Sequence, residues 1–205
     1  MRKPIYFSSD WHIGSENSLK FDKRPFRDLD HMHSELIKNF NKQVPVDGLT
    51  YFLGDMATHS SELTKQVIEQ LNGTKIIVVG NHDKKYESLY NCGFHAVMHN
   101  ATIIIHNERV TMSHCPLLGL YREDTSEMKG RTEGELWHGE FRHARYSVED
   151  KGQFHLHGHI HSPNGGKSTK ILGRQFDCGL PANSYRPVHI SHIESWIMKT
   201  IKEEK

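Results

Sequence analysis

The sequence lacks long apolar runs, a cysteine framework and a strong net charge. None of its apolar runs approaches the roughly 20 residues that a membrane helix requires. Its three cysteines, Cys92, Cys115 and Cys178, are odd in number and widely spaced, which predicts reduced thiols in a cytoplasmic protein. Its 26 Lys and Arg residues and 25 Asp and Glu residues leave a net charge of +1. That balance weighs against a general attraction to nucleic acids or membranes.

The composition fits a soluble globular protein that is rich in histidine. The chain has 205 residues, of which 36% are hydrophobic and 25% are charged, so we expect a single domain over residues 1–205 with a substantial core. Its 17 histidines are more than one site needs. Most of them are therefore expected at the surface or in hydrogen bonds, and the informative ones are those that lie beside Asp, Asn and Gly.

Strand-like and helix-like segments alternate in the first half of the chain. Strands are predicted over 4–9, 49–53 and 76–79, a helix over about 28–44, and a second helix from Ser60 or Ser61 to about 71. Residues 13–28 are expected to form a loop, and a short helix is expected to end near 91. This alternation is typical of a parallel α/β arrangement.

The second half predicts a different arrangement of strands. Residues 101–106 and 109–113 are expected to pair as a hairpin with a turn at 107–108, and further strands are expected at 154–157 and 170–178. A Ser-x-x-Glu capping box at Ser191 and Glu194 predicts the start of a last helix. Between the hairpin and the next strand lies a long polar segment, 117–153. A segment of this length inside a compact domain is often a lid or a binding insertion, and the alternative is a solvated loop.

Polar residues that can bind metals follow five of the predicted strands. In open α/β sheets the carboxyl ends of the strands are where ligands bind, and carboxylate with imidazole suits manganese, iron, zinc or nickel better than calcium or magnesium. Each group has an ordinary alternative, such as a turn with a capping Asp or a Gly-Asn turn. The five groups are Asp10 with His12, Asp55, Asn81 with His82, His114, and His159 with His161.

These groups resemble, in order, the signature of the calcineurin-like metallophosphoesterase superfamily. The motifs are Asp10-Trp11-His12, Gly54-Asp55, Gly80-Asn81-His82-Asp83, His114, and Gly158-His159-Ile160-His161. Each motif alone is weak, but five in the right order make coincidence very improbable. The resemblance implies a four-layer α-β-β-α sandwich in which helices flank two mixed sheets.

The resemblance also implies a binuclear metal centre. Two divalent transition-metal ions, manganese above all and otherwise iron, zinc or nickel, would hydrolyse phosphomonoesters or phosphodiesters, with nucleotides among the candidates, through attack of a metal-bridging hydroxide. Asp55 would bridge the two ions. One ion would be held by Asp10, His12, Asp55 and His161, and the other by Asp55, Asn81, His114 and His159.

Residues beyond the ligands are assigned roles by the same resemblance. His82 would act catalytically at the leaving oxygen, and Asp83 would hold its imidazole in place. His155 and His157 are expected to be buried hydrogen-bonded groups rather than extra ligands. The Asp-Arg continuation of protein Ser/Thr phosphatases is absent after Asp55, which puts phosphoprotein substrates in doubt. Candidate substrate contacts are His59, Trp137, His138, Arg142 and Arg186.

Two alternatives to a small-molecule phosphoesterase remain open at this point. The first is a non-catalytic metal-binding scaffold on the same fold, against which the retained His82 and the complete ligand sets argue. The second is a nuclease of the same superfamily. Such nucleases are usually longer and carry an added DNA-binding domain, so the length and the near-zero net charge of this chain argue against that function.

Overall fold

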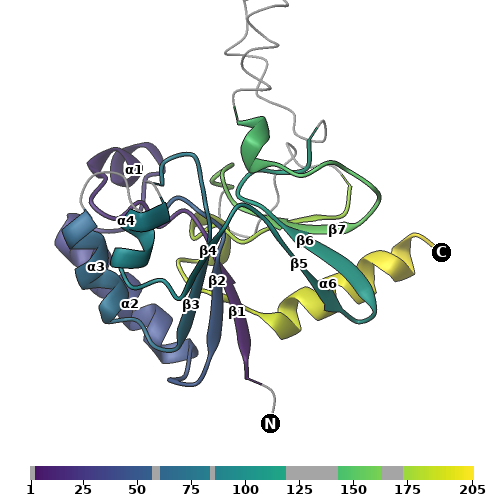
Figure 1. Cartoon of the computed structure of the whole chain (residues 1–205), viewed down its shortest axis with the longest axis horizontal. Helices are drawn as coiled ribbons and strands as arrows, with labels where there is room; N and C mark the ends of the chain where they lie inside the picture. Colours follow the sequence, from purple (N-terminus) through teal and green to yellow (C-terminus); the bar gives the residue numbers. More distant parts are fainter. Residues whose placement is uncertain (1–2, 57–60, 84–85, 119–142, 163–172) are drawn as a thin grey trace, which may run out of the picture.

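The computed structural model describes residues 3–56, 61–83, 86–118, 143–162 and 173–205. In these ranges the chain forms two mixed sheets (Figure 1). The five-stranded sheet has the order β4-β3-β2-β1-β9, in which only β9 runs antiparallel to its neighbour. Its strands are β1 (Ile5–Ser8), β2 (Leu49–Phe52), β3 (Thr74–Val78), β4 (Ala96–Met98) and β9 (Val188–His189).

The four-stranded sheet has the order β5-β6-β7-β8. Its first pair is the antiparallel hairpin, and the other two pairs are parallel. Its strands are β5 (Ala101–Ile105), β6 (Glu108–Met112), β7 (Phe154–His157) and β8 (Gln175–Asp177). The loops that follow β1, β2, β3, β6 and β7 contact one another through hydrogen bonds and so converge on one region of the fold.

Helices flank the sheets on both sides (Figure 1). One group lies beside the five-stranded sheet, and the C-terminal helix packs on the other side with apolar residues of the four-stranded sheet. None of the helices in the described ranges is long and apolar enough to cross a membrane. The helices are α1 (Glu16–Phe21), α2 (Leu29–Gln43), α3 (Ser61–Glu69), α4 (Tyr86–Asn91) and α6 (Ile190–Glu203), with 3-10 turns at Ala144–Tyr146 and Pro181–Asn183.

Strand alternation divides the core into two clusters. Successive side chains of a strand point to opposite faces of its sheet, so each central strand contributes to both clusters. Tyr6, Phe52 and Ile77 pack in the cluster that contains the α2 residues Leu36 and Phe40. Their neighbours Phe7, Leu53 and Val78 pack with Val110, Met112, Phe154 and Leu156 of the other sheet and with Ile193 and Ile197 of α6. This is the α-β-β-α architecture that the resemblance implies, and the predicted fold class is confirmed.

Four local predictions were wrong in detail. Residues 13–28 contain the helix α1, which Ser15 caps by accepting the Ser18 N–H at 3.2 Å; the helix has six residues, too few for a clear apolar period. The hairpin turn lies at His106 and Asn107, one residue early, with φ of 52° and 64°, as a two-residue turn requires. The first helical residue of α6 is Ile190, and its cap is His189 instead of Ser191. The two short edge strands of the five-stranded sheet, β4 and β9, were missed.

Candidate metal centre

Five of the seven predicted ligands have left-handed backbone conformations. The φ values are 60° at Asp10, 50° at His12, 53° at Asp55, 71° at His159 and 44° at His161. Non-glycine residues rarely adopt this region, although Asp and His do so more readily than most. Such conformations persist only where the surrounding structure enforces them, and they cluster at functional sites. Each of these residues therefore turns sharply out of its strand end.

Backbone hydrogen bonds join the loops that carry these residues. The N–H of Asp10 donates to the Gly54 carbonyl at 3.1 Å, and the N–H of His12 donates to the Asp55 carbonyl at 2.9 Å. The Asp10 carboxylate in turn accepts the N–H of His159, with 3.1 Å to each oxygen. The loops after β1, β2 and β7 thus hold one another in place, although they are far apart in the sequence.

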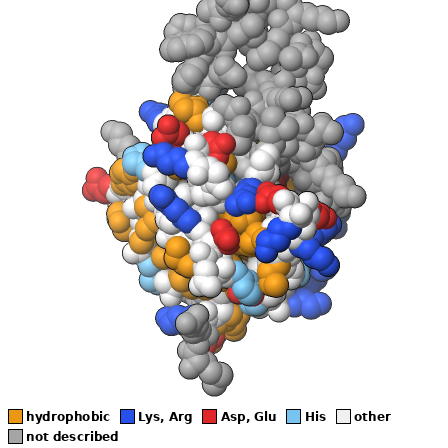
Figure 2. Space-filling model, turned by 90° about the vertical axis from the view of Figure 1, so that its right-hand side faces the viewer, with side chains coloured by type: hydrophobic (Ala, Val, Ile, Leu, Met, Phe, Trp, Pro, Cys, Tyr) orange, Lys and Arg blue, Asp and Glu red, His pale blue; other side chains and the backbone are white. Residues whose placement is uncertain are grey.

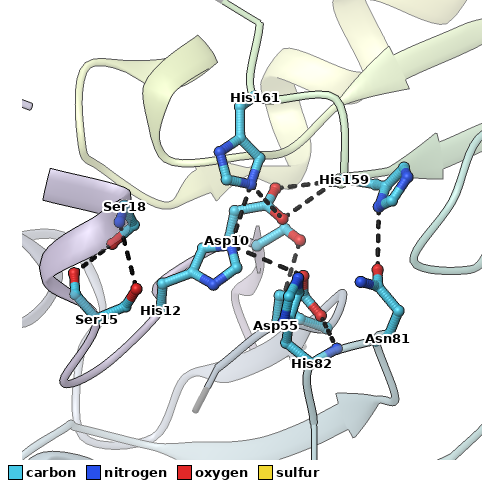
Figure 3. A network of polar contacts seen from close by, with 12 residues as sticks. Asp10, His12, Ser15, Ser18, Asp55, Asn81, His82, His159 and His161 are labelled. Atoms are coloured by element: carbon cyan, nitrogen blue, oxygen red, sulfur yellow. Dashed lines mark hydrogen bonds and ion pairs between the residues drawn. The ribbon is translucent and has the colours of Figure 1, made fainter. Parts of the chain in front are cut away.

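Asp10, His12 and His161 form the first group of potential ligands. Their ligand atoms all lie within 4.8 Å of one another. The Nε2 atoms of His12 and His161 are 3.0 Å apart, and His161 Nε2 lies 3.5 Å from Asp10 Oδ1. Figure 3 shows the three side chains pointing toward one another.

Asn81, His114 and His159 form the second group. The Asn81 Oδ1 atom lies 2.9 Å from His114 Nε2 and 3.0 Å from His159 Nδ1. The two imidazole nitrogens are 3.3 Å apart. Three ligand atoms from the ends of β3, β6 and β7 therefore converge on one point, and Figure 3 shows Asn81 facing His159 there.

Asp55 lies between the two groups. Its Oδ2 atom is 3.7 Å from His12 Nε2 in the first group and 3.3 Å from His114 Nε2 in the second. The carboxylate is almost fully buried. A Cβ atom on Gly80 would approach Asp55 Oδ1 to 2.2 Å, so only glycine lets the β3 loop lie this close. One carboxylate oxygen therefore reaches both groups of potential ligands.

The orientation of the imidazoles shows that each group could hold a cation. His114 Nδ1 lies 2.8 Å from the Leu53 carbonyl, which can only accept, so Nδ1 carries the proton. In the neutral ring, Nε2 then presents a lone pair to Asn81 Oδ1, which is itself an acceptor. His161 repeats this arrangement, because its Nδ1 contacts both carboxylate oxygens of Asp22, at 2.8 and 2.9 Å. Two sets of lone pairs that face one another fit metal ions.

Without metal ions, each group contains one histidine whose pKa is raised and one whose pKa is lowered. Burial opposes protonation of His114, but the carboxylates of Asp55 and Asp10 outweigh it and raise its pKa to about 9. For His161 the carboxylates of Asp10 and Asp22 likewise overcome burial and raise the pKa to about 10. Burial lowers the pKa of His12 to about 4 and that of His159 to about 3. One protonated imidazole in each group supplies the positive charge that a cation would bring.

His82 lies at the edge of the cluster with an exposed side chain. Its backbone N–H donates to Asp55 Oδ1 at 2.8 Å, and its ring centroid is 5.4 Å from that of His12. It is therefore adjacent to the first group and accessible to a substrate.

The Asp83 carboxylate binds three backbone N–H groups in the structure. Its carboxylate accepts the N–H groups of Asp55, Met56 and Gly80, each at 2.8 Å. These contacts fix the loops that carry Asp55 and His82. They support a role in loop geometry, and the hold on the His82 imidazole stays a prediction.

His155 and His157 lie deeper in the fold and in neither group of ligands. Their rings stack with centroids 5.9 Å apart. His155 Nδ1 contacts the Thr111 hydroxyl at 2.9 Å, and its Nε2 contacts the Cys115 carbonyl at 3.2 Å. His157 Nδ1 donates to the Gly158 carbonyl at 2.8 Å. Both are the buried hydrogen-bonded groups that the sequence predicts.

Of the five predicted substrate contacts, the structure describes only Arg186. His59, Trp137, His138 and Arg142 lie outside the described residues. Arg186 lines a groove of about 590 Å³ together with Tyr6 and His192, and none of the seven predicted ligands lines that groove. The structure thus does not bring Arg186 into the cluster.

Sequence reasoning missed three further residues that border the cluster. Asp22 and Arg24, beside α1, contact the first group. The ring centroid of His143 lies 5.2 Å from that of His159 in the second group. His143 precedes the 3-10 turn whose Tyr146 carbonyl accepts the Cys115 N–H at 2.9 Å. None of the three belongs to a motif. Asp22 and Arg24 lie in a segment that was expected to be a loop, and His143 lies in segment 117–153, which was expected to be a lid, a binding insertion or a solvated loop.

Comparisons with known proteins agree with the fold and leave the activity open. No sequence model of a known family matches the chain. The uncharacterized protein MJ1445 of Methanocaldococcus jannaschii is 36% identical over 111 residues, which are 52% of this chain and 60% of that protein. The chain therefore spans less than two thirds of this relative. The gene 66 protein of Mycobacterium phage L5 is 27% identical over 192 residues, or 86% of each chain.

Among solved structures, the protein of unknown function AQ665 from Aquifex aeolicus matches with a TM-score of 0.68 and 22% identity, covering 95% of this chain and 99% of that one. This likeness shows a shared fold. The YfcE phosphoesterase from E. coli matches 87% of this chain and 79% of its own with a TM-score of 0.43 and 13% identity. A novel archaeal phosphodiesterase matches 85% and 84% with a TM-score of 0.39 and 17% identity. Scores this low carry no argument about activity.

Proposed function

We propose that this chain, which has the fold and the five motifs typical of calcineurin-like metallophosphoesterases, hydrolyses phosphate esters with two divalent transition-metal ions. The observation that carries the proposal is the position of Asp55, whose Oδ2 lies 3.7 Å from His12 Nε2 and 3.3 Å from His114 Nε2. A carboxylate that reaches two convergent sets of nitrogen and oxygen ligands is the arrangement that a binuclear site needs.

The proposed ligand sets are those expected from the sequence. Metal ions bound there would lower the pKa of a water molecule and neutralise phosphate charge. Asp10 and Asp55 bring two negative charges against the four positive charges of two divalent ions, so the loaded site keeps a net attraction for a phosphate ester. Imidazole-rich sets favour manganese, iron, zinc or nickel. One ion would be bound by Asp10, His12, Asp55 and His161, and the other by Asp55, Asn81, His114 and His159.

His82 is the proposed proton donor to the leaving oxygen. Its side chain is exposed, and its backbone N–H is fixed by Asp55 Oδ1 at 2.8 Å. An imidazole at the open edge of the site can protonate or stabilise the oxygen that departs from phosphorus. His82 borders the first group and His143 borders the second, so a substrate phosphate placed over the cluster would meet an imidazole on each side. We assign segment 117–153 a role in substrate binding on this basis.

The substrate class that fits is a small phosphomonoester or phosphodiester, with nucleotides among the candidates. On the face in Figure 2, Lys and Arg side chains are interspersed with acidic and apolar ones. This mixed face does not favour a long polyanion. In the proposal, the attraction for phosphate resides in the metal centre.

A combined measurement of metal content and hydrolysis tests the proposal. The Mn²⁺-loaded protein should contain two ions per chain and hydrolyse p-nitrophenyl phosphate or bis-p-nitrophenyl phosphate. A panel of nucleotides, cyclic nucleotides and dinucleotides would then define the substrate. Asp55→Ala should weaken both ions together and abolish turnover, whereas Asp47→Ala, a substitution at an exposed carboxylate, should change neither. A loaded protein with no esterase activity on any member of the panel would refute the proposal.

A further inference from the structure

We infer that Asp22 and Arg24 form a positioning pair that sets the affinity of one metal position, the one that contains His161, and leaves the other position unaffected. The inference rests on the proposed function. It adds two residues outside the five motifs and assigns both to the metal position that contains His161.

Asp22 fixes the tautomer and the orientation of His161. Both carboxylate oxygens lie within hydrogen-bond distance of His161 Nδ1, at 2.8 and 2.9 Å. The proton is therefore held on Nδ1, and Nε2 is directed toward His12 Nε2 at 3.0 Å and Asp10 Oδ1 at 3.5 Å. A carboxylate behind a ligand imidazole also makes that imidazole a stronger donor to a metal.

The helix α1 places Asp22 at this point. Asp22 is the C-terminal cap of the helix, and its N–H donates to the Ser18 carbonyl at 3.2 Å. At the other end Ser15 caps the helix (Figure 3). The short helix after the Asp-x-His motif thus returns the chain to the ligand cluster.

Arg24 connects Asp22 to the loop after β1. Its guanidinium is fully buried and makes three hydrogen bonds to oxygen. Nε donates to Asp22 Oδ2 at 3.0 Å, Nη2 donates to the Asp10 carbonyl at 2.9 Å, and Nη1 donates to the Trp11 carbonyl at 3.0 Å. These two carbonyls belong to the stretch in which Asp10 and His12 are left-handed. Arg24 therefore fixes the left-handed backbone at Asp10 and His12 relative to the Asp22 carboxylate, which contacts His161.

The second position is supported in a different way. The imidazole of His114 is oriented by a backbone carbonyl, that of Leu53, at 2.8 Å. Neither Asp22 nor Arg24 has a described contact with Asn81, His114 or His159. A change at Asp22 should therefore act on the position of His161 alone, whereas a general loss of stability would weaken both.

Calorimetric binding of Mn²⁺ to the full-length metal-free protein tests this asymmetry. Asp22→Ala should weaken one of the two binding steps by about 10- to 100-fold and leave the other step unchanged. Asp22→Asn, which keeps an acceptor oxygen, should weaken the same step less. Arg24→Lys keeps the charge but not the planar arrangement of donors, and it should weaken that step as well. The matched control is Glu16→Gln, which alters an exposed carboxylate of the same helix and should leave both steps unchanged.

The outcomes separate the inference from the proposed function. If folded Asp22→Ala and Asp22→Asn proteins bind both ions as the wild type does, or lose both steps equally, the positioning role is wrong. Should Asp22→Ala not fold, as judged by thermal unfolding, the Asp22→Asn protein decides alone. A wild-type protein that binds fewer than two Mn²⁺ ions contradicts the binuclear proposal itself, whatever the variants do.

Discussion

Single residues at the strand ends carry the strain that defines this site. Asp10, His12, Asp55, His159 and His161 all have φ between 44° and 71°, and such conformations cost on the order of 1–3 kcal/mol each. Hydrogen bonds from neighbouring loops, such as that from the His12 N–H to the Asp55 carbonyl, offset this cost. The strained backbone therefore keeps the ligands close together before any cation is bound, which reduces the ordering that binding requires.

The role of His82 can be separated from metal binding. We expect His82→Ala to lower turnover of bis-p-nitrophenyl phosphate by about 10²- to 10⁴-fold, because the leaving oxygen loses its proton donor. Metal analysis of the same sample should still find both ions. His99→Ala, at another exposed histidine, should behave as wild type. Loss of metal from His82→Ala would mean that the residue supports the ligands instead.

His155 is expected to make the free energy of unfolding depend on pH in the acid range. Burial, with a smaller effect of His157, lowers its pKa from 6.5 to about 3, so the folded state favours the neutral ring that contacts Thr111 and Cys115. Because the folded pKa lies below the unfolded one, this stabilisation is complete above pH 6.5 and declines as the pH falls toward 3. Over that window the free energy of unfolding should decrease by up to about 1.4 kcal/mol per pH unit for this one proton.

Urea unfolding of the metal-free protein between pH 7 and about 4 measures this slope. His155→Gln removes the titrating ring and should give a shallower dependence on pH, although its stability at pH 7 is reduced. His192→Gln, at an exposed histidine, should keep the wild-type slope. Equal slopes in the wild type and His155→Gln would show that this ring does not titrate in the window.

At the scale of elements, the C-terminal helix has a structural role that the ligand loops do not share. In α6, Ile193 and Ile197 are fully buried in the cluster that joins both sheets, and Trp196 packs edge-on against Phe154 and Phe176. The carboxyl ends of β1, β2, β3, β6 and β7 carry the ligands, and α6 contributes none of them. Stability and chemistry are thus divided between different elements.

Substitutions at two neighbouring positions of α6 test this division. Ile197→Ala should lower the free energy of unfolding by about 2–5 kcal/mol, because it leaves a cavity at a fully buried site. Met198→Ala, at a side chain that is 56% exposed, should change stability by less than about 0.5 kcal/mol. Chemical unfolding measures both. Neither folded variant should alter the Mn²⁺ content, and a specific loss of metal from Ile197→Ala would contradict the division.

For the whole molecule, the proposed metal binding is linked to folding, because the predicted ligands converge only in the folded chain. Mn²⁺ at about 100 times its dissociation constant should stabilise the protein by about 2.7 kcal/mol for each ion bound, which for a chain of this size raises Tm by roughly 5–10 °C per ion. Chelation should reverse the change. Asp55→Ala should lose most of the increase, and an equal increase in that variant would place the bound metal elsewhere.

The sequence by itself determined the α/β alternation of the first half of the chain and the order of the ligand motifs. Apolar runs such as 76–79 that are followed by polar residues are local patterns, and the ends of parallel strands meet at one edge of a sheet. Asp10, Asp55 and Asn81 could therefore be assigned together, although their convergence on one cluster is a fact of the structure.

Only the tertiary structure decided which residues support that cluster. Asp22 contacts His161 across 139 positions of sequence, Arg24 reaches back to the Asp10 carbonyl, and Asp83 binds backbone of the β2 loop. No local pattern contains these contacts, because they depend on the path of the chain between the partners. Periodicity reports which face of an element is buried, whereas the partner of a buried polar group is fixed only when the elements pack.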